Sequence, residues 1–136
     1  MHVHACIAVL EFTMRIAIVV DARNERQIVS ALWGLLAVNL SQMNASYPSV
    51  YSFARYEREQ PGRPEIWQSA DALRRSRIGD CEDLSAYHCA WLRVTGRDTG
   101  ATIGLKRSSV GWHIIVVRSD GSIDDPSAEL GMYGDG

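Results

Sequence analysis

The sequence predicts a mixed α+β fold in a single domain, because two helical segments are followed by a run of strands. Apolar residues recur at helical spacing over residues 22–43, and Asp80 with Asp83 marks the start of a second helix over residues 81–94. Residues 101–105 predict a strand, and residues 106–109 predict a basic loop. Residues 110–118 are rich in β-branched side chains and predict a further strand before a hairpin turn. With 136 residues, 46% of them hydrophobic, the chain has the size of one domain with one core.

Charge and cysteine content exclude several classes of protein. The formal net charge of -2 and the lack of a basic stripe argue against a nucleic-acid partner. The apolar runs 5–10 and 16–20 are interrupted by Glu11 and Arg15, so neither is long enough to span a bilayer, and no signal peptide precedes them. Three cysteines without paired spacing make no disulfide framework. We therefore expect a cytoplasmic protein with no membrane partner.

The N-terminal residues predict two strands, 3–11 and 15–20. On the first strand His2, His4 and Cys6 would share one face, which is a pattern that could seat a metal. The sequence offers no obvious further ligands, so an edge strand is the favoured interpretation and no metal is expected.

The middle of the chain predicts a long helix over residues 22–43, capped by Asp21. Residues 44–64 then change to Tyr, Ser, Pro, Gly and charged residues, which predicts a long irregular excursion of functional importance. A short helix carrying Trp67 should follow over residues 64–75.

The candidate nucleophile is Cys81, in the first turn of the helix that should end before Gly96. Unpaired backbone N–H groups and the helix dipole favour a thiolate there. Glu82 and Asp83 oppose it, because neighbouring carboxylates repel a second negative charge. A histidine that forms a thiolate–imidazolium pair is therefore required.

Two histidines compete for that role. His88 lies two turns along the same helix as Cys81, about 10 Å away along the axis, which is too far for direct proton transfer. His113 stands at the start of the β-rich run 110–118 and is the favoured base. His88 is then a core or interface residue, and Cys89 a small buried hydrophobe.

The hairpin that follows decides which aspartate can reach His113. If its loop has three residues and ends in a left-handed glycine, Arg118 pairs with Ser122, and Asp125 shares a face with His113 one diagonal step away. A two-residue loop moves the register by one and brings Asp124 to that face, with a longer reach. Geometry favours Asp125, and Asp124 remains the alternative.

These motifs together resemble the transglutaminase-like cysteine hydrolase superfamily. The resemblance rests on Gly-Asp-Cys-Glu-Asp-Leu-Ser at 79–85, Trp-His at 112–113 and Asp-Pro-Ser at 125–127. Tyr-Ser-Phe-Ala-Arg-Tyr at 51–56, with Trp67, is similar to small phage and prophage members in particular. The resemblance covers residues 47–132 of a chain that we expect to form a single domain, 1–136. It implies a papain-like fold in which the catalytic helix packs on an antiparallel sheet, here with an additional long N-terminal helix.

The resemblance also implies a chemistry and an environment for the thiol. Cys81, His113 and Asp125 would form a triad for acyl transfer on a peptide or amide bond through a thioester, with hydrolysis or cross-linking as outcomes and no cofactor. The alternative is a silent binding or assembly module, associated with a phage particle.

The candidate residues for oxyanion and substrate binding surround the thiol. Trp67 is the aromatic oxyanion donor that the resemblance implies, although a core role is favoured for it. Gly79 allows close approach to the backbone before the nucleophile, and Asp80 caps the helix. Tyr56, with Tyr51 and Phe53, lines a groove or packs in the core. The substrate would be a protein or peptide.

Overall fold

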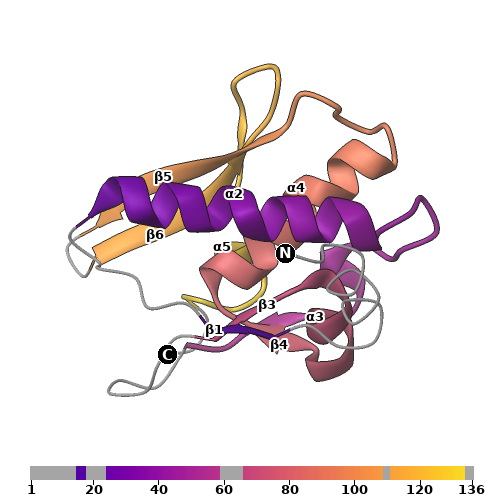
Figure 1. Ribbon diagram of the computed structural model, residues 1–136, viewed down its shortest axis with the longest axis horizontal. Coiled ribbons are helices and arrows are strands. Elements are labelled where there is room, and N and C mark those ends of the chain that lie inside the picture. The colour runs from indigo at the N-terminus through magenta and orange to yellow at the C-terminus, as the bar shows by residue number, and fades with distance from the viewer. Residues whose placement is uncertain (1–14, 18–23, 59–65, 109–110, 134–136) are drawn as a thin grey trace, which may run out of the picture.

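The computed structural model in Figure 1 describes residues 15–17, 24–58, 66–108 and 111–133. Within these ranges the chain is a mixed α+β structure, as predicted. Its helices are α2 (Glu25–Gln42), α3 (Ala70–Ser76), α4 (Cys81–Val94) and α5 (Pro126–Glu129), with a 3-10 turn, η1 (Val50–Ser52). Its strands are β1 (Arg15–Ala17), β2 (Arg55–Tyr56), β3 (Ile66–Gln68), β4 (Ile78–Gly79), β5 (Thr102–Ser108), β6 (Gly111–Val117) and β7 (Ile123–Asp124).

The strands form three small sheets. β5, β6 and β7 form an antiparallel sheet in chain order. β1 pairs with β3 in antiparallel fashion, and β2 pairs with β4 in parallel. The two smaller sheets flank the start of α4, so segments far apart in the sequence meet around the residue that begins this helix.

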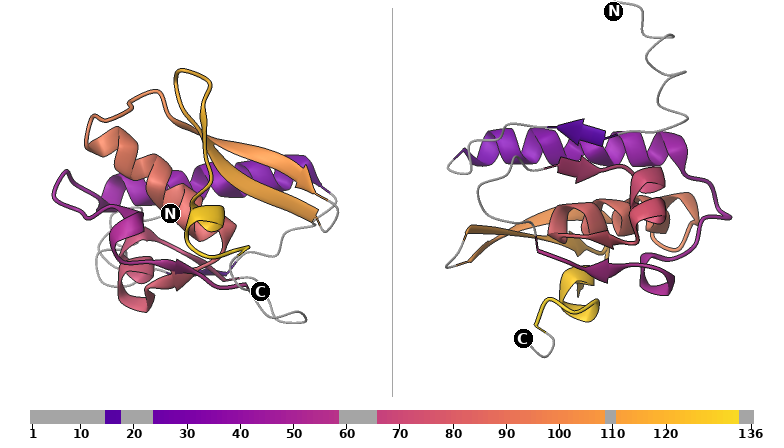
Figure 2. Two further views of the ribbon diagram at one scale, coloured as in Figure 1. Left: turned by 180° about the vertical axis from the view of Figure 1, so that it is seen from behind. Right: turned by 90° about the horizontal axis from the view of Figure 1, so that it is seen from below.

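Helix α2 covers one face of the antiparallel sheet. It crosses in front of β5 and β6 in Figure 1 and behind them in the left view of Figure 2. The apolar stripe predicted for it is confirmed, since its buried apolar residues are Ile28, Leu32, Leu35 and Leu36. The cap prediction is wrong: the helix begins at Glu25, and the side chain of Asn24 accepts a hydrogen bond from the Gln27 N–H at 3.2 Å. A capping side chain reaches only the next two or three amides, so Asp21 is too far from this start.

Helix α4 has the predicted bounds and packs between α2 and β6. Gly96 follows it with a φ of 75°, the left-handed conformation expected for a helix end. Ser85 Oγ donates a hydrogen bond to the Ile114 carbonyl at 3.0 Å and so ties the helix to β6. The helix that carries the candidate nucleophile is therefore fixed on the antiparallel sheet.

The short helix predicted over residues 64–75 is wrong in its first half. Residues 59–65 lie outside the described part of the chain, and Ile66–Gln68 is strand β3, opposite β1 with Ile16 facing Trp67. The Gln68 N–H donates to Asp83 Oδ1 at 2.7 Å. Partners remote in the sequence override local helix propensity here, and the helix starts only at Ala70.

The basic loop predicted over residues 106–109 is also wrong where it can be compared. β5 continues to Ser108, and Lys106 and Arg107 pair with His113 and Trp112 of β6. The long β6 strand supplies ladder partners that the sequence of the loop alone does not reveal.

Three further predictions meet the structure only in part. Of the strand predicted over 15–20, Arg15–Ala17 forms β1. The strand over 3–11 and the metal pattern of His2, His4 and Cys6 lie outside the described residues. In the described ranges, no group of three or more His, Cys, Asp or Glu side chains could hold a metal ion. No helix in those ranges is both long and apolar enough to cross a membrane.

Candidate active site

Cys81 is the first residue of α4, directly after the N-cap residue Asp80. The Asp80 N–H faces the Asp83 carboxylate, with 3.4 Å between the amide nitrogen and Oδ2, in the capping box that the sequence predicts. The thiol thus lies where the free N–H groups of the helix and its dipole favour negative charge. The N–H of Cys81 lies at the same helix terminus.

The Asp83 carboxyl links this N-terminus of α4 to strand β3. It is 2% exposed and accepts hydrogen bonds from the Gln68 N–H at 2.7 Å and Gln68 Nε2 at 3.2 Å. Burial raises the pKa of the Asp83 carboxyl to about 6, against the lowering effect of those hydrogen bonds. The carboxyl therefore ties β3 to the start of α4, and its own ionisation changes close to neutral pH.

Gly79 fits under this support because it has no side chain. A Cβ at this position would lie 2.9 Å from the Asp83 Cβ and 3.0 Å from Leu73 Cδ1. The space beside Gly79 is therefore filled by side chains of α3 and α4. The approach of a substrate to this glycine stays a prediction. A larger residue would displace the helix start.

Tyr56 lies close to the start of α4, and its role in the site stays a prediction. It pairs with Gly79 in the parallel β2–β4 ladder. Burial raises the pKa of the Tyr56 hydroxyl, and the negative charge of a Cys81 thiolate raises it further. The hydroxyl is thus a neutral donor within electrostatic range of Cys81.

Trp67 belongs to the core. It is 3% exposed and lies in a buried apolar cluster with Ile114 of β6, against which Cys81 and Trp112 also pack. The core role favoured from the sequence is confirmed, and the cluster brings the start of α4 next to the start of β6. His113 follows Trp112 directly at this point.

The Cys81 thiol has an acidic neighbour that sequence analysis identified only as a repelling charge. Cys81 Sγ donates to Glu82 Oε2, with 3.3 Å between sulfur and oxygen. Glu82 is 5% exposed, so its carboxyl is held in the protein rather than in solvent. Adjacency in the sequence was the available signal, but which way the side chain turns depends on packing.

The pairing of His113 with Asp125 is the clearest outcome of the hairpin geometry. Arg118 N–H donates to the Ser122 carbonyl at 2.7 Å, and Gly121 has a φ of 88°, so the loop has three residues. His113 Nε2 and Asp125 Oδ2 are 2.8 Å apart. The structure thus confirms the three-residue loop and the choice of Asp125 as the carboxylate on His113.

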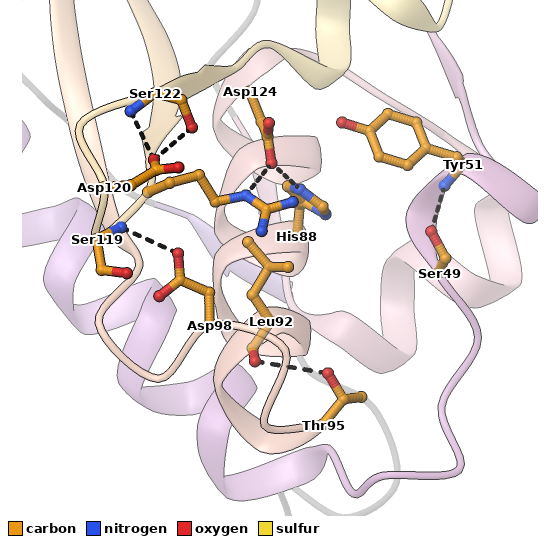
Figure 3. Close-up of polar contacts among 11 residues, drawn as sticks. Ser49, Tyr51, His88, Leu92, Thr95, Asp98, Ser119, Asp120, Ser122 and Asp124 are labelled. Atoms are coloured by element: carbon orange, nitrogen blue, oxygen red, sulfur yellow. Dashed lines mark hydrogen bonds and ion pairs between the residues drawn. The ribbon is translucent and has the colours of Figure 1, made fainter.

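Asp124, the alternative aspartate, pairs with His88 and not with His113. Asp124 pairs with Val116 in the ladder, and its Oδ2 is 2.8 Å from His88 Nε2 (Figure 3). His88 is 2% exposed, which confirms it as a core residue. Burial lowers the pKa of His88, although Asp124 acts in the opposite direction.

The other candidates lie in the core or pack against it. Cys89 is fully buried, and burial raises the pKa of its thiol to about 11. Tyr51 packs edge-on against His88, with 5.1 Å between ring centroids, and Phe53 packs in the same way on Tyr87 at 5.3 Å. Of the three aromatic residues proposed for a groove, only Tyr56 is placed beside the thiol.

Comparison of the chain with models of known families, with curated proteins and with solved structures finds no match. The function is therefore argued from the site itself.

Proposed function

We propose that the chain is a cysteine-dependent acyl-transfer enzyme of the transglutaminase-like, papain-fold type, with Cys81 as nucleophile and His113 as base. The observation that carries the proposal is the His113–Asp125 pair, 2.8 Å between Nε2 and Oδ2. A carboxylate on Nε2 favours the tautomer that carries its proton there, which leaves the Nδ1 lone pair for a thiol. What distinguishes this pair from His88–Asp124 is its place: His113 follows Trp112, which packs against the same apolar cluster as Cys81.

The position of the thiol supports the same chemistry. Cys81 begins a long helix that is packed on the sheet carrying His113. The helix terminus stabilises negative charge on sulfur and on the carbonyl oxygen of a bound substrate. Burial keeps the nucleophile partly out of water, so a charge on the imidazolium would act on it strongly.

The proposed reaction has two halves. The Cys81 sulfur attacks the carbonyl carbon of an amide after its proton passes to His113, and the C–N bond breaks as His113 returns that proton to the leaving amine. In the second half His113 takes a proton from water, the hydroxide oxygen adds to the thioester, and the thiol leaves with the proton. An amine in place of water gives cross-linking instead of hydrolysis.

The first half requires the thiol to change its partner. In the structure Cys81 Sγ donates to Glu82 Oε2. Catalysis requires the sulfur to give its proton to His113 Nδ1 instead. Glu82 therefore competes with His113 for the thiol.

We propose a protein or peptide as the substrate and no cofactor, since the proposed cycle uses only the triad and a water molecule or an amine. From the composition we place the enzyme in the cytoplasm, and the motif resemblance suggests association with a phage particle. The competing proposal is a silent assembly module of the same fold, which has no use for a reactive thiol.

The test is alkylation of the full chain by iodoacetamide between pH 5 and 9, read for each cysteine by mass spectrometry. A thiol with no partner titrates near 8.5, so at pH 6 a paired Cys81 should react on the order of 10²-fold faster than such a thiol. His113→Ala should abolish this advantage, and the core variant Leu36→Val should keep it. Cys89, buried with a raised thiol pKa, is the internal reference in each sample.

The outcomes separate the two proposals. Loss of the advantage in His113→Ala alone supports the enzyme and justifies a substrate search with peptide amides. If Cys81 reacts equally slowly in the wild type and in His113→Ala, the catalytic proposal fails and the assembly module takes its place.

A further inference from the structure

The second histidine–aspartate pair lies on the residue next to the proposed catalytic carboxylate. Asp124 Oδ2 accepts from His88 Nε2 at 2.8 Å and from Arg118 Nε at 2.7 Å. The pair joins α4, which carries Cys81, to β7, which leads into Asp125. Figure 3 shows the His88 ring directed at the Asp124 carboxylate.

Packing fixes the His88 ring. Its edge contact with Tyr51 has 5.1 Å between centroids, and the Trp91 ring stacks on it at 6.1 Å with 20° between the planes. Burial, the largest influence on this group, lowers the pKa of His88, so the ring is a neutral donor whose Nε2–H serves Asp124. Asp124 is thereby hydrogen-bonded to a ring whose position is fixed by packing.

Strand β7 needs such an anchor because it is short. Its ladder to β6 consists of two residue pairs, Val116 with Asp124 and Val117 with Ile123. Neighbouring residues of a strand point to opposite faces, and a slip of one residue exchanges them. Because residues 124 and 125 are both aspartates, such a slip would still present a carboxylate to each face, so the side chains themselves do not oppose it strongly.

We propose that His88 and Arg118 form an anchor that holds Asp124 and thereby keeps Asp125 opposite His113. The catalytic consequence of this anchor rests on the proposed function, but the anchor itself does not. His88 and Arg118 are positioning residues that act through β7. Asp125 receives a second restraint at its other oxygen, because Oδ1 accepts from the Ala128 N–H at 3.2 Å.

The anchor is tested by the exchange of the His113 Nε2 proton with water, measured by NMR on the full ¹⁵N-labelled chain. Two variants differ in the anchor alone: Asp124→Ala removes the acceptor, and Asp124→Asn retains an oxygen that accepts from His88. We expect exchange about tenfold faster in Asp124→Ala and within about twofold of wild type in Asp124→Asn. Asp125→Ala gives the rate with no carboxylate partner.

A remote core variant, Leu36→Val, controls for general loss of stability and should leave the His113 proton unchanged. His88→Leu removes the other half of the anchor and should reproduce Asp124→Ala. If His88→Leu fails to fold, Asp124→Ala, whose side chain is 23% exposed, decides the matter alone. Unchanged exchange of the His113 proton in folded Asp124→Ala overturns the proposal.

Alkylation of Cys81 in the same variants separates the anchor from the proposed function. Slower alkylation in Asp124→Ala, in step with faster proton exchange, supports both. If proton exchange responds and alkylation responds to neither Asp124→Ala nor His113→Ala, the anchor stands and the acyl-transfer proposal fails.

Discussion

The two histidine–aspartate pairs use the same atoms at the same distance in different surroundings. In each, a histidine Nε2 lies 2.8 Å from an aspartate Oδ2, and the aspartates are neighbours in the chain. The His88 ring is 2% exposed and the His113 ring 13% exposed. Asp124 also pairs with the Arg118 guanidinium, whereas Asp125 is the N-cap residue of α5. The bond alone therefore does not identify a catalytic group.

The two pairs differ in how tightly the surrounding protein packs around each histidine ring. Aromatic rings on two sides and an additional guanidinium on its partner leave His88 no room to move or to transfer a proton. His113 lies at the beginning of β6, beside the residue that packs against the same apolar cluster as Cys81. Burial makes one pair structural, and the proposed function assigns the reaction to the other, which is partly exposed.

The largest expected difference between the pairs is in stability. Truncation of the buried ring in His88→Ala should lower the free energy of unfolding by about 3 kcal/mol, since it leaves a cavity and removes a buried partner of Asp124. His113→Ala, at the less buried ring, should cost about 1 kcal/mol. Urea unfolding followed by circular dichroism measures both, and equal losses would contradict the comparison.

The next effect concerns the thiol. Glu82→Gln removes both the charge that opposes a thiolate and the carboxylate that accepts from Cys81, so Cys81 alkylation at pH 7 should become about tenfold faster. Glu57→Gln, an exposed carboxyl on β2's C-terminal side, is the matched control and should leave the rate within about twofold. A slower rate in Glu82→Gln would mean that this carboxyl assists the thiol.

The pH dependence of stability should distinguish His88 by its sign. Burial lowers the folded-state pKa of His88 below the ordinary 6.5, so below that pH the unfolded chain binds a proton at His88 more readily than the folded chain. The contribution of neutral His88 to the free energy of unfolding is complete above pH 6.5. It is lost as the pH falls below 6.5 and through the lower folded-state pKa. The difference in unfolding free energy between wild type and His88→Gln should therefore shift against wild type from pH 7.5 to 5.

That measurement must be a difference between variants because Asp83 acts in the opposite sense. Its pKa is raised to about 6 by burial, so the folded chain holds a proton that the unfolded chain releases, and this stabilisation is lost as the pH rises through about 6. Both proteins contain Asp83, and its contribution cancels. A difference that does not vary with pH would show that His88 titrates alike in both states.

The smallest effect should come from Arg118. Its side chain is 32% exposed, so Arg118→Gln should cost less than about 1 kcal/mol in urea unfolding, even though the Nε contact with Asp124 is short. Arg97→Gln, which removes a guanidinium over the Trp91 ring instead, is a control at a similar surface position. A loss of several kcal/mol in Arg118→Gln would mean that Arg118, rather than His88, carries the anchor.

The sequence predicted those parts of the molecule whose cause is local. Helix α4 has its expected bounds because a capping box and a glycine at the far end determine them. The His113–Asp125 pair follows from a three-residue loop and the alternation of a strand. Hairpin register is a local property, so one turn was sufficient to choose between two aspartates.

The failures have the opposite origin. Ile66–Gln68 is a strand because β1 lies beside it, and Gln68 is 53 residues from its partner Arg15. His88 and Asp124 are 36 residues apart. No local pattern encodes such partners. The Lys106–Ser108 extension of β5 is different, because it pairs with β6 only a few residues further along the chain.

The hydrogen bonds of β2 determine when, during synthesis, the segments around Cys81 can come together. Backbone amides of β2 and the residue after it bond to both sides of the site: Glu57 N–H donates to the Gly79 carbonyl and Tyr56 N–H to the Leu130 carbonyl, each at 2.9 Å. During synthesis the thiol emerges well before Asp125 and Leu130. Under the proposed function, a nascent chain therefore carries an unassembled nucleophile until residues 125–130 have been translated.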